Sequence, residues 1–445
     1  MDQYTRLINI CSSCLRCGAF FIAIMVVCAY LLAGPAWGGT IVSRDDFDFR
    51  LIVNDRFHTF NNFYDYGNND FSSTRNYHIT YVNPYLSARL GPNMRAVLEL
   101  ETDFILDLDN RHISENTEVR NAYLQCMLPS LNWVSFSIGR QALRTIDGLL
   151  YDYDAPGLKA YADIERGFDI PLKAQLFIAK VSDRSPYFHS QLTYNFSFLE
   201  SITLSYDWLR ENNDGMARIV NRLNSEQQLD FNSNGTIQWY SCSVEKFVSK
   251  VLLKATASYE KGYAYLRASG QNDRKLNTEG YLVYATADYS FSKKLLGTLF
   301  CYLSSGDRDP LKGTFTTFLA IDPYTDITSI FFNGGFDRQF SSRNLGLNGV
   351  QLNGVIAPGV TLYYRPTRRM SLKGVYAYLI THKGAGVMGN TYGWETDFMG
   401  SYDINEHWQL IAEVNVFTPG HYFKELTNGA DHVSSEILAG ITYNF

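Results

Sequence analysis

The last ten residues, 436–445, constrain this chain more than any other segment, because apolar and polar side chains alternate through them. One parity is apolar and ends on the terminal aromatic residue: Ile437, Ala439, Ile441, Tyr443 and Phe445. The other parity is mostly polar, with Leu438 as the exception. A side-chain period of two predicts a β-strand with one apolar face and one polar, water-facing side. A strand ending in Tyr-Asn-Phe, on a long tyrosine-rich chain, favours a closed barrel in a bacterial outer membrane.

The same alternation recurs along the chain, in segments 47–56, 95–104, 202–208, 253–260 and 409–417. Candidate strands of membrane-spanning length number roughly 16–20, and even counts make about 18 the central expectation. The sequence therefore predicts an all-β fold, a transmembrane antiparallel β-barrel, with the first strand near 47–56 closing against the last. Phe445 is expected to serve as an assembly signal for the barrel-assembly machinery.

Composition supports one barrel rather than several soluble domains. Of the 445 residues, 31 are Tyr and 29 are Phe, yet the mean hydropathy is only −0.17. A barrel accounts for both values, because half of each strand faces lipid, half faces water, and aromatic girdles line the two interfaces. A large secreted all-β protein is the alternative. The formal net charge of −6 weighs against nucleic-acid binding.

The first 38 residues read as an export signal. An apolar run at 19–33 follows Arg6 and Arg16 and precedes small residues that allow cleavage near Gly38 or Gly39. A run of about 15 apolar residues is short for a spanning helix and suits a signal peptide, with an uncleaved anchor as the alternative. Residues 39–445 then form a single barrel domain. Cys126, Cys242 and Cys301, which remain in it, are too few and too widely spaced for a disulfide framework.

Turn signals differ in length between connections. Short turns are expected at 91–93, 291–294, 365–368 and 403–406, and longer loops at 210–225, 304–345, 381–391 and 418–433. Short turns on one side and long loops on the other are typical of outer-membrane barrels. The longest, 304–345, exceeds a plain connector, which indicates a folded-in constriction or an outer lid.

Strand parity selects candidate luminal charges. The candidate cations are Arg50, Arg56, Arg95 and Arg120, and the candidate counter-charges are Asp48, Glu99, Glu101, Asp103, Glu395 and Asp397. Arginines in a low-dielectric wall attract carboxylates, and alternating acids would keep a polyanion from sticking. For any single arginine the alternative is a solvated residue with no selective role.

Four ordered segments resemble the alginate-export family of outer-membrane barrels. They begin at Ile138 (IGRQALR, with Asp147-Gly148-Leu149 behind it), Ser304 (SSGD), Tyr392 (YGWETD, leading to Gly400-Ser401-Tyr402) and Phe417 (FTPGHYF). The resemblance spans about the whole mature chain. It implies a monomeric barrel of about 18 strands, with a charged lumen for export or passive passage of a polyanion or small solute. It adds Arg140, Arg144 and Asp147 to the candidate luminal charges.

Arg140 conflicts with simple parity. It shares a parity with Val134, Phe136 and Ile138, the apparent lipid face. An arginine at the middle of the bilayer would cost about 2–4 kcal/mol. A bulge at Gly139 that turns Arg140 inward is the favoured explanation, and a strand that has already left the membrane is the other.

The sequence does not favour an enzyme. The eight histidines are scattered, and neither HExxH nor GxSxG occurs. No cofactor is expected, although the acids within 307–309 and 322–326 could hold Ca²⁺ without the regular spacing of an EF-hand.

The predicted function is an outer-membrane porin or export channel for a polyanionic saccharide or small anionic solutes. Expected partners are the bilayer, lipopolysaccharide, the assembly machinery and periplasmic polysaccharide-export components. One rival is a barrel sheath around a multihaem cytochrome in an electron conduit. The other is a structural or adhesive barrel with no transport role, which a lumen filled by large side chains would favour.

Overall fold

The alternating segments form a barrel wall that closes on itself. The main sheet contains 19 strands, of which eighteen are antiparallel neighbours and β16 is a two-residue strand that pairs parallel with β14. Closure is made by β1 (Phe47–Asn61), which pairs with β4 (Arg75–Arg89) on one side and β23 (Ser434–Asn444) on the other. The predicted barrel and its predicted seam are confirmed.

The other wall strands follow in chain order. They are β5 (Met94–Asp107), β6 (His112–Leu128), β7 (Leu131–Thr145), β8 (Tyr151–Asp163), β9 (Leu172–Ser182), β10 (Ser185–Ser197), β11 (Glu200–Glu211), β12 (Phe231–Val248), β13 (Val251–Ala268), β14 (Arg274–Ser292), β15 (Leu295–Ser304), β19 (Val355–Tyr364), β20 (Met370–Ile380), β21 (Thr391–Asp403) and β22 (Trp408–Pro419).

Short elements lie in the connections. The helical ones are η2 (Ile146–Gly148), α2 (Ile164–Phe168), α3 (Gly215–Leu223), η3 (Ser329–Asn333) and α4 (His421–Leu426). The short strands are β2 (Tyr64–Asp65), β3 (Asp70–Phe71), β16 (Thr314–Phe315), β17 (Leu319–Ala320) and β18 (Gly346–Leu347).

The computed structural model describes residues 46–62, 64–65, 70–71, 74–182, 184–212, 214–223, 231–268, 273–307, 313–321, 327–333, 346–347, 353–383, 389–427 and 432–445. The expected signal peptide, residues 1–38, lies outside these ranges. Within them, no helix has the length and apolarity needed to cross a membrane. Cys126, Cys242 and Cys301 are free thiols.

The outer face of the wall is apolar. Ile138, Leu299 and Phe398 each expose more than 60% of their surface there. Exposed leucines, valines and aromatics continue this face around the barrel. Such a band costs free energy in water and suits lipid. The residues of opposite parity point inward, and most of the charged side chains of the wall belong to that inner set.

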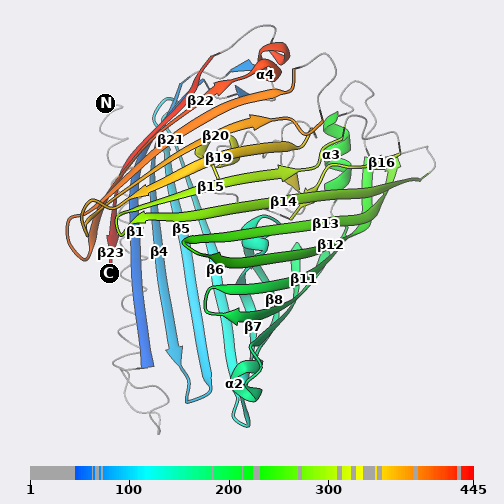
Figure 1. Cartoon of the computed structure of the whole chain (residues 1–445), viewed down its shortest axis with the longest axis vertical. Helices are drawn as coiled ribbons and strands as arrows, with labels where there is room; N and C mark the ends of the chain where they lie inside the picture. The colour runs from blue at the N-terminus through cyan, green and yellow to red at the C-terminus, as the bar shows by residue number, and fades with distance from the viewer. Residues whose placement is uncertain are drawn as a thin grey trace, which may run out of the picture.

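The two ends of the barrel differ. The C-terminus and the turns at 91–93, 293–294, 365–369 and 404–407 lie at one end, called the turn end below. Helices α3 and α4 and strand β16 lie at the opposite, loop end (Figure 1). The predicted asymmetry of short turns and long loops is confirmed.

Part of the long β15–β19 connection folds into the loop-end half of the lumen. Residues 313–321 and 327–333 of this connection, called the plug below, contribute fully buried aromatic side chains such as Phe318 and Phe331. The Ile321 amide donates to the Leu150 carbonyl at 2.7 Å, and the Trp239 indole donates to the Leu319 carbonyl at 2.8 Å. Leu150 lies in the β7–β8 connection and Trp239 on β12, so the plug bridges separate parts of the barrel.

Candidate functional site

The turn end of the lumen carries a basic mouth. The mouth cluster consists of Asp48 and Arg50 on β1, Arg89 on β4 and Arg95 on β5. Arg50 forms an ion pair with Asp48 at 2.8 Å. Its guanidinium also lies 5.6 Å from the centre of the Tyr85 ring. Asp48, Arg89 and Arg95 line a cavity of about 340 Å³.

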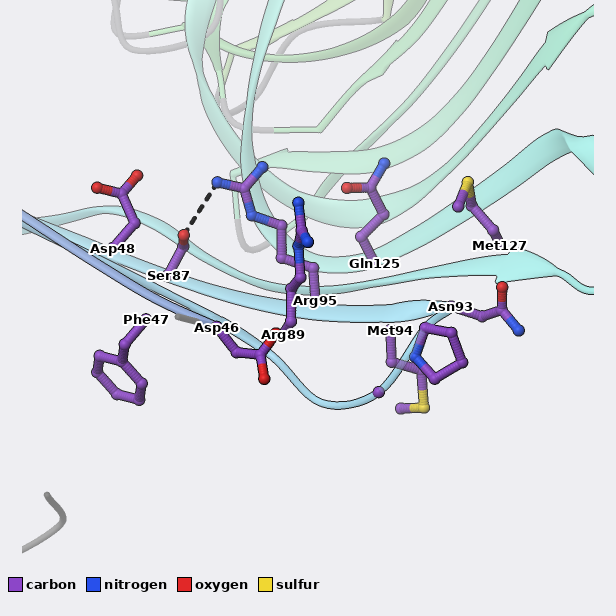
Figure 2. A pocket seen from close by; sticks show the side chains of 12 residues that line it. Asp46, Phe47, Asp48, Ser87, Arg89, Asn93, Met94, Arg95, Gln125 and Met127 are labelled. Carbon is purple, nitrogen blue, oxygen red and sulfur yellow. Dashed lines mark hydrogen bonds between the residues drawn. The ribbon is translucent and has the colours of Figure 1, made fainter. Parts of the chain in front are cut away.

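Figure 2 shows how the cavity is built. Arg89 and Arg95 project to the same side of the sheet as Asp48 and Gln125, whereas Phe47 points the opposite way. This division follows strand parity. It places Asp48, Arg89 and Arg95 on the face of the sheet opposite Phe47.

Deeper in the lumen, carboxylates dominate. The mid-lumen cluster consists of Glu99, Glu101, Asp103, Glu118, Arg120, Arg140 and Asp154. Arg120 forms an ion pair with Asp154 at 2.8 Å and approaches Glu101 at 3.8 Å. Because the Asp154 side chain is only 3% exposed, this pair is the most buried arginine–carboxylate contact in the described part of the site.

Strand irregularities place the two arginines of this cluster. The β5–β6 register shifts at Glu99/Leu100, which leaves Arg120 without a direct partner on β5. On the other side, the β6–β7 ladder ends at Ala122 and Arg140. Gly139 just before it has a φ of +129° that favours glycine.

Arg140 stays paired with Pro156 on β8, although the pairing of β7 with β6 ends at this residue. Its guanidinium lies 5.7 Å from the centre of the Tyr153 ring, whose hydroxyl donates to Glu118 at 2.7 Å. Parity assigns Arg140 to the lipid face, whereas these contacts place its guanidinium beside Tyr153 and Glu118. The β7–β8 ladder has no register shift at Gly139, so the predicted bulge is not observed there.

The remaining predicted residues lie apart from these two clusters. Arg56 stacks 5.7 Å from the Tyr81 ring centre. Arg144 donates to the Asp147 carbonyl at 2.9 Å, and both side chains are exposed at the loop end. The structure therefore does not bring Arg144 and Asp147 together with the mid-lumen cluster.

Glu395 and Asp397 point inward, and the plug covers them. Glu395 accepts hydrogen bonds from the Thr328 hydroxyl at 2.7 Å and from the amides of Ile330 and Phe331 at 2.5 and 2.9 Å. Asp397 accepts from the Ser329 amide at 3.0 Å. Both carboxylates have no exposed surface. In this structure they hold the plug and are not in contact with an open passage.

Sequence reasoning overlooked four charged residues that matter for this arrangement. Glu260 on β13 accepts from the Leu319 amide at 2.6 Å and holds the plug from another side of the wall. Arg89, Glu118 and Asp154 belong to the clusters above. Glu260 stands on the polar parity of segment 253–260 and Arg89 on the luminal parity of β4, so strand alternation alone could have found both.

His382 joins the loop end of β20 to the start of the long connection. Its Nδ1 accepts from the Gly306 amide at 3.1 Å, and its Nε2 lies 2.8 Å from the Tyr281 hydroxyl. An accepting Nδ1 requires the neutral ring with the proton on Nε2. Burial, followed by the charge of Lys383, lowers the pKa of His382 below its ordinary value of 6.5.

This contact predicts an acid-sensitive loop end. Because the folded-state pKa is lowered, the stabilisation is complete above about pH 6.5 and declines as the pH falls toward the lowered pKa. Between about pH 7.5 and 5, the unfolding midpoint of the wild type should fall more than that of His382→Gln, which keeps the hydrogen-bonding groups without titrating. Equal slopes for the two proteins would contradict the prediction.

Among the described residues, no group of three histidine, cysteine or acidic side chains could hold a metal ion. Of the loop acids considered for calcium, Asp309 and the whole of 322–326 lie outside the described ranges. Calcium binding there stays a prediction.

Comparison with known proteins supports the fold. No family model and no curated protein matches the sequence. Solved structures do match: Pseudomonas aeruginosa OpdK with vanillate has a TM-score of 0.53 and 10% identity, covering 90% of this chain and 99% of that one. OpdL of the same organism has a TM-score of 0.54 and 11% identity, with the same coverage. OprD has a TM-score of 0.50 and 10% identity, covering 92% and 94%.

These likenesses, together with the closed barrel and its apolar outer face, define the class. The chain is a bacterial outer-membrane β-barrel with a porin-like fold. The turn end is therefore the periplasmic end and the loop end the extracellular end. The resemblance to the alginate-export family in particular gains no support, because no family model matches and the similar structures are other outer-membrane proteins.

Proposed function

We propose that this barrel is a passive channel for small anionic solutes, with the plug setting its aperture. The observation that carries the proposal is the row of inward arginines on the adjacent strands β1 and β4–β7: Arg50, Arg56, Arg89, Arg95, Arg120 and Arg140. Each planar guanidinium can hold a carboxylate with two hydrogen bonds and keeps its charge at any physiological pH.

The counter-charges suit passage rather than tight binding. Glu99, Glu101 and Asp103 follow the arginines along β5, so an anion that leaves the mouth meets repulsion as well as attraction. A low-dielectric wall focuses both fields into the lumen. Conduction requires binding that is strong enough to admit the solute and weak enough to release it.

The plug favours small solutes over a polysaccharide. Its buried aromatic residues pack with wall residues such as Tyr302 and Tyr392, at ring-centre distances of 5.2 and 5.3 Å, and fill lumen near the extracellular end. Export of a polyanionic saccharide, as the alginate-export resemblance implies, would need a longer continuous bore. The structure of OpdK with vanillate, a small carboxylate, is compatible with the smaller cargo.

The rival functions fit less well. A sheath for a cytochrome needs a lumen free for another protein, whereas this lumen holds the chain's own plug. A purely structural barrel fits a filled extracellular half, but it gives no reason for a row of inward arginines at the periplasmic half. Ion current is the property that separates a channel from both rivals.

Planar-bilayer recording tests the proposal. In a KCl gradient the wild type should conduct with anion preference, and Arg50→Glu/Arg56→Glu should shift the reversal potential toward cation preference. Arg368→Glu, in the exposed periplasmic turn after β19, makes the same charge change outside the lumen and should leave selectivity unchanged. Absence of current from folded protein, or cation preference in the wild type, would refute the proposal.

A further inference from the structure

Two arginines face each other directly at the periplasmic mouth. In the β4–β5 ladder Arg89 is the register partner of Arg95, and both line the same cavity. Directly opposed side chains on one face of an antiparallel pair have Cβ atoms about 4.5–5.5 Å apart, and like charges in that relation destabilise the sheet. The opposed arginines lower the stability of the sheet, so their presence calls for a functional explanation.

Ion pairs with acidic residues of the described chain do not neutralise Arg89 and Arg95. Elsewhere in the lumen the arginines have acids: Arg50 pairs with Asp48, and Arg120 with Asp154. In the described part of the chain, neither Arg89 nor Arg95 forms an ion pair. Asp46 and Asp48 also line the cavity, and Asp48 is already engaged by Arg50.

Arg95 is held in place by neutral hydroxyl groups. One terminal nitrogen of Arg95, Nη2, donates to the Tyr85 hydroxyl at 3.1 Å and to the Ser87 hydroxyl at 2.9 Å (Figure 2 draws the latter). Among the described residues, its Nε and Nη1 make no hydrogen bond. The guanidinium is therefore oriented in advance, with donors left over for a ligand.

The cavity fits a small oxyanion. Its volume of about 340 Å³ lies at the lower end of the range for small-molecule sites. Arg89, Arg95 and Gln125 project into it from three adjacent strands, β4, β5 and β6 (Figure 2). Two guanidinium groups side by side match a group with two or more charged oxygens, such as a phosphate or a dicarboxylate.

We propose that Arg89 and Arg95 form an oxyanion-binding site at the periplasmic mouth, which takes a phosphate or carboxylate group of a soluble solute. The site deepens the proposed channel function by naming where an anion is held. Its binding is nevertheless measurable without any current, so the two proposals can fail separately.

Calorimetric titration of the folded barrel in phospholipid-free detergent tests the site. The probes are inorganic phosphate and succinate, against chloride at equal ionic strength. Wild type should bind phosphate or succinate in preference to chloride, and Arg89→Gln and Arg95→Gln should each weaken that binding about tenfold, since each removes charged hydrogen bonds. Arg368→Gln, an equal charge change at the same end of the barrel, should bind as the wild type does.

Charge reversal gives a second readout that a merely structural pair would not produce. Arg89→Glu places a carboxylate opposite Arg95, so it should abolish phosphate binding and raise the temperature at which the folded barrel converts to the unfolded band in electrophoresis. A variant that unfolds at a lower temperature, or that still binds phosphate, would overturn the assignment.

A lipid headgroup has the same chemistry as a phosphate solute, so a third probe separates the sources. Short-chain phosphatidylglycerol should bind no better than inorganic phosphate does. If only the lipid binds, or if wild type and Arg89→Gln/Arg95→Gln bind all probes equally, the solute site is wrong. Anion-selective current with no binding at the mouth would refute this site and leave the proposed channel standing.

Discussion

Replacing Glu395 by alanine is expected to raise single-channel conductance several-fold. The Glu395 side chain is fully buried and accepts three hydrogen bonds from the plug residues Thr328, Ile330 and Phe331. Intramolecular hydrogen bonds contribute about 0.5–1.5 kcal/mol each. Their loss removes much of what fixes the plug to β21, so the plug should spend more time away from the wall.

Glu413→Ala is the matched control for this experiment. Glu413 lies on the neighbouring strand β22, opposite Met399, and makes no hydrogen bond to the described plug residues. Its loss removes the same side chain without releasing the plug. Equal conductance in Glu395→Ala and wild type, with both proteins folded, would show that the plug does not limit the current.

Glu260 offers an independent check on the same mechanism. It holds the plug through the Leu319 amide from β13, a different part of the wall from Glu395 on β21. Because the two carboxylates anchor different segments, 313–321 and 327–333, Glu260→Ala and Glu395→Ala should each increase conductance. Their combination should exceed either alone if the plug moves in parts.

Strand parity predicted most features of the barrel wall. It identified the closing strand, the seam with 47–56 and the inward set on β1 and β5, because a side-chain period of two leaves little freedom where one face meets lipid. It failed at Arg140, where the β6–β7 ladder ends and Gly139 adopts a positive φ. A local break in pairing is invisible to a rule that assumes continuous pairing.

The length of the 304–345 connection predicted a constriction or a lid, but strand parity could not predict the contacts of the plug. Parity predicts that Glu395 and Asp397 point inward, and they do, but it cannot say what covers them. The segments that cover them have no strand or helix period, and their contacts with Glu260, Leu150 and Trp239 join residues far apart in the chain. Such pairings follow from the closed wall, which has to exist before the loop can pack into it.

Arg120→Gln is expected to destabilise the barrel more than any other single change in the mid-lumen cluster. The guanidinium lies against Asp154 at 2.8 Å and Glu101 at 3.8 Å, and 5.5 Å from the Tyr153 ring centre. Its removal leaves a carboxylate with a side-chain exposure of 3% unpaired among other acids. Breaking a buried ion pair in this way costs about 3–5 kcal/mol.

The more exposed pair of Lys254 and Glu245 on the luminal parity of β12 and β13 supplies the comparison. Its charged atoms lie 3.1 Å apart, but each side chain is 40% exposed, so Lys254→Gln should cost less than about 1 kcal/mol. Unfolding by urea in lipid vesicles would measure both changes. Arg120→Gln/Asp154→Asn, which removes both charges, should recover most of the lost stability, because the penalty arises from the orphaned Asp154 carboxylate. If the double variant is no more stable than Arg120→Gln, the stabilisation by Arg120 comes from packing on Tyr153 and not from its charge.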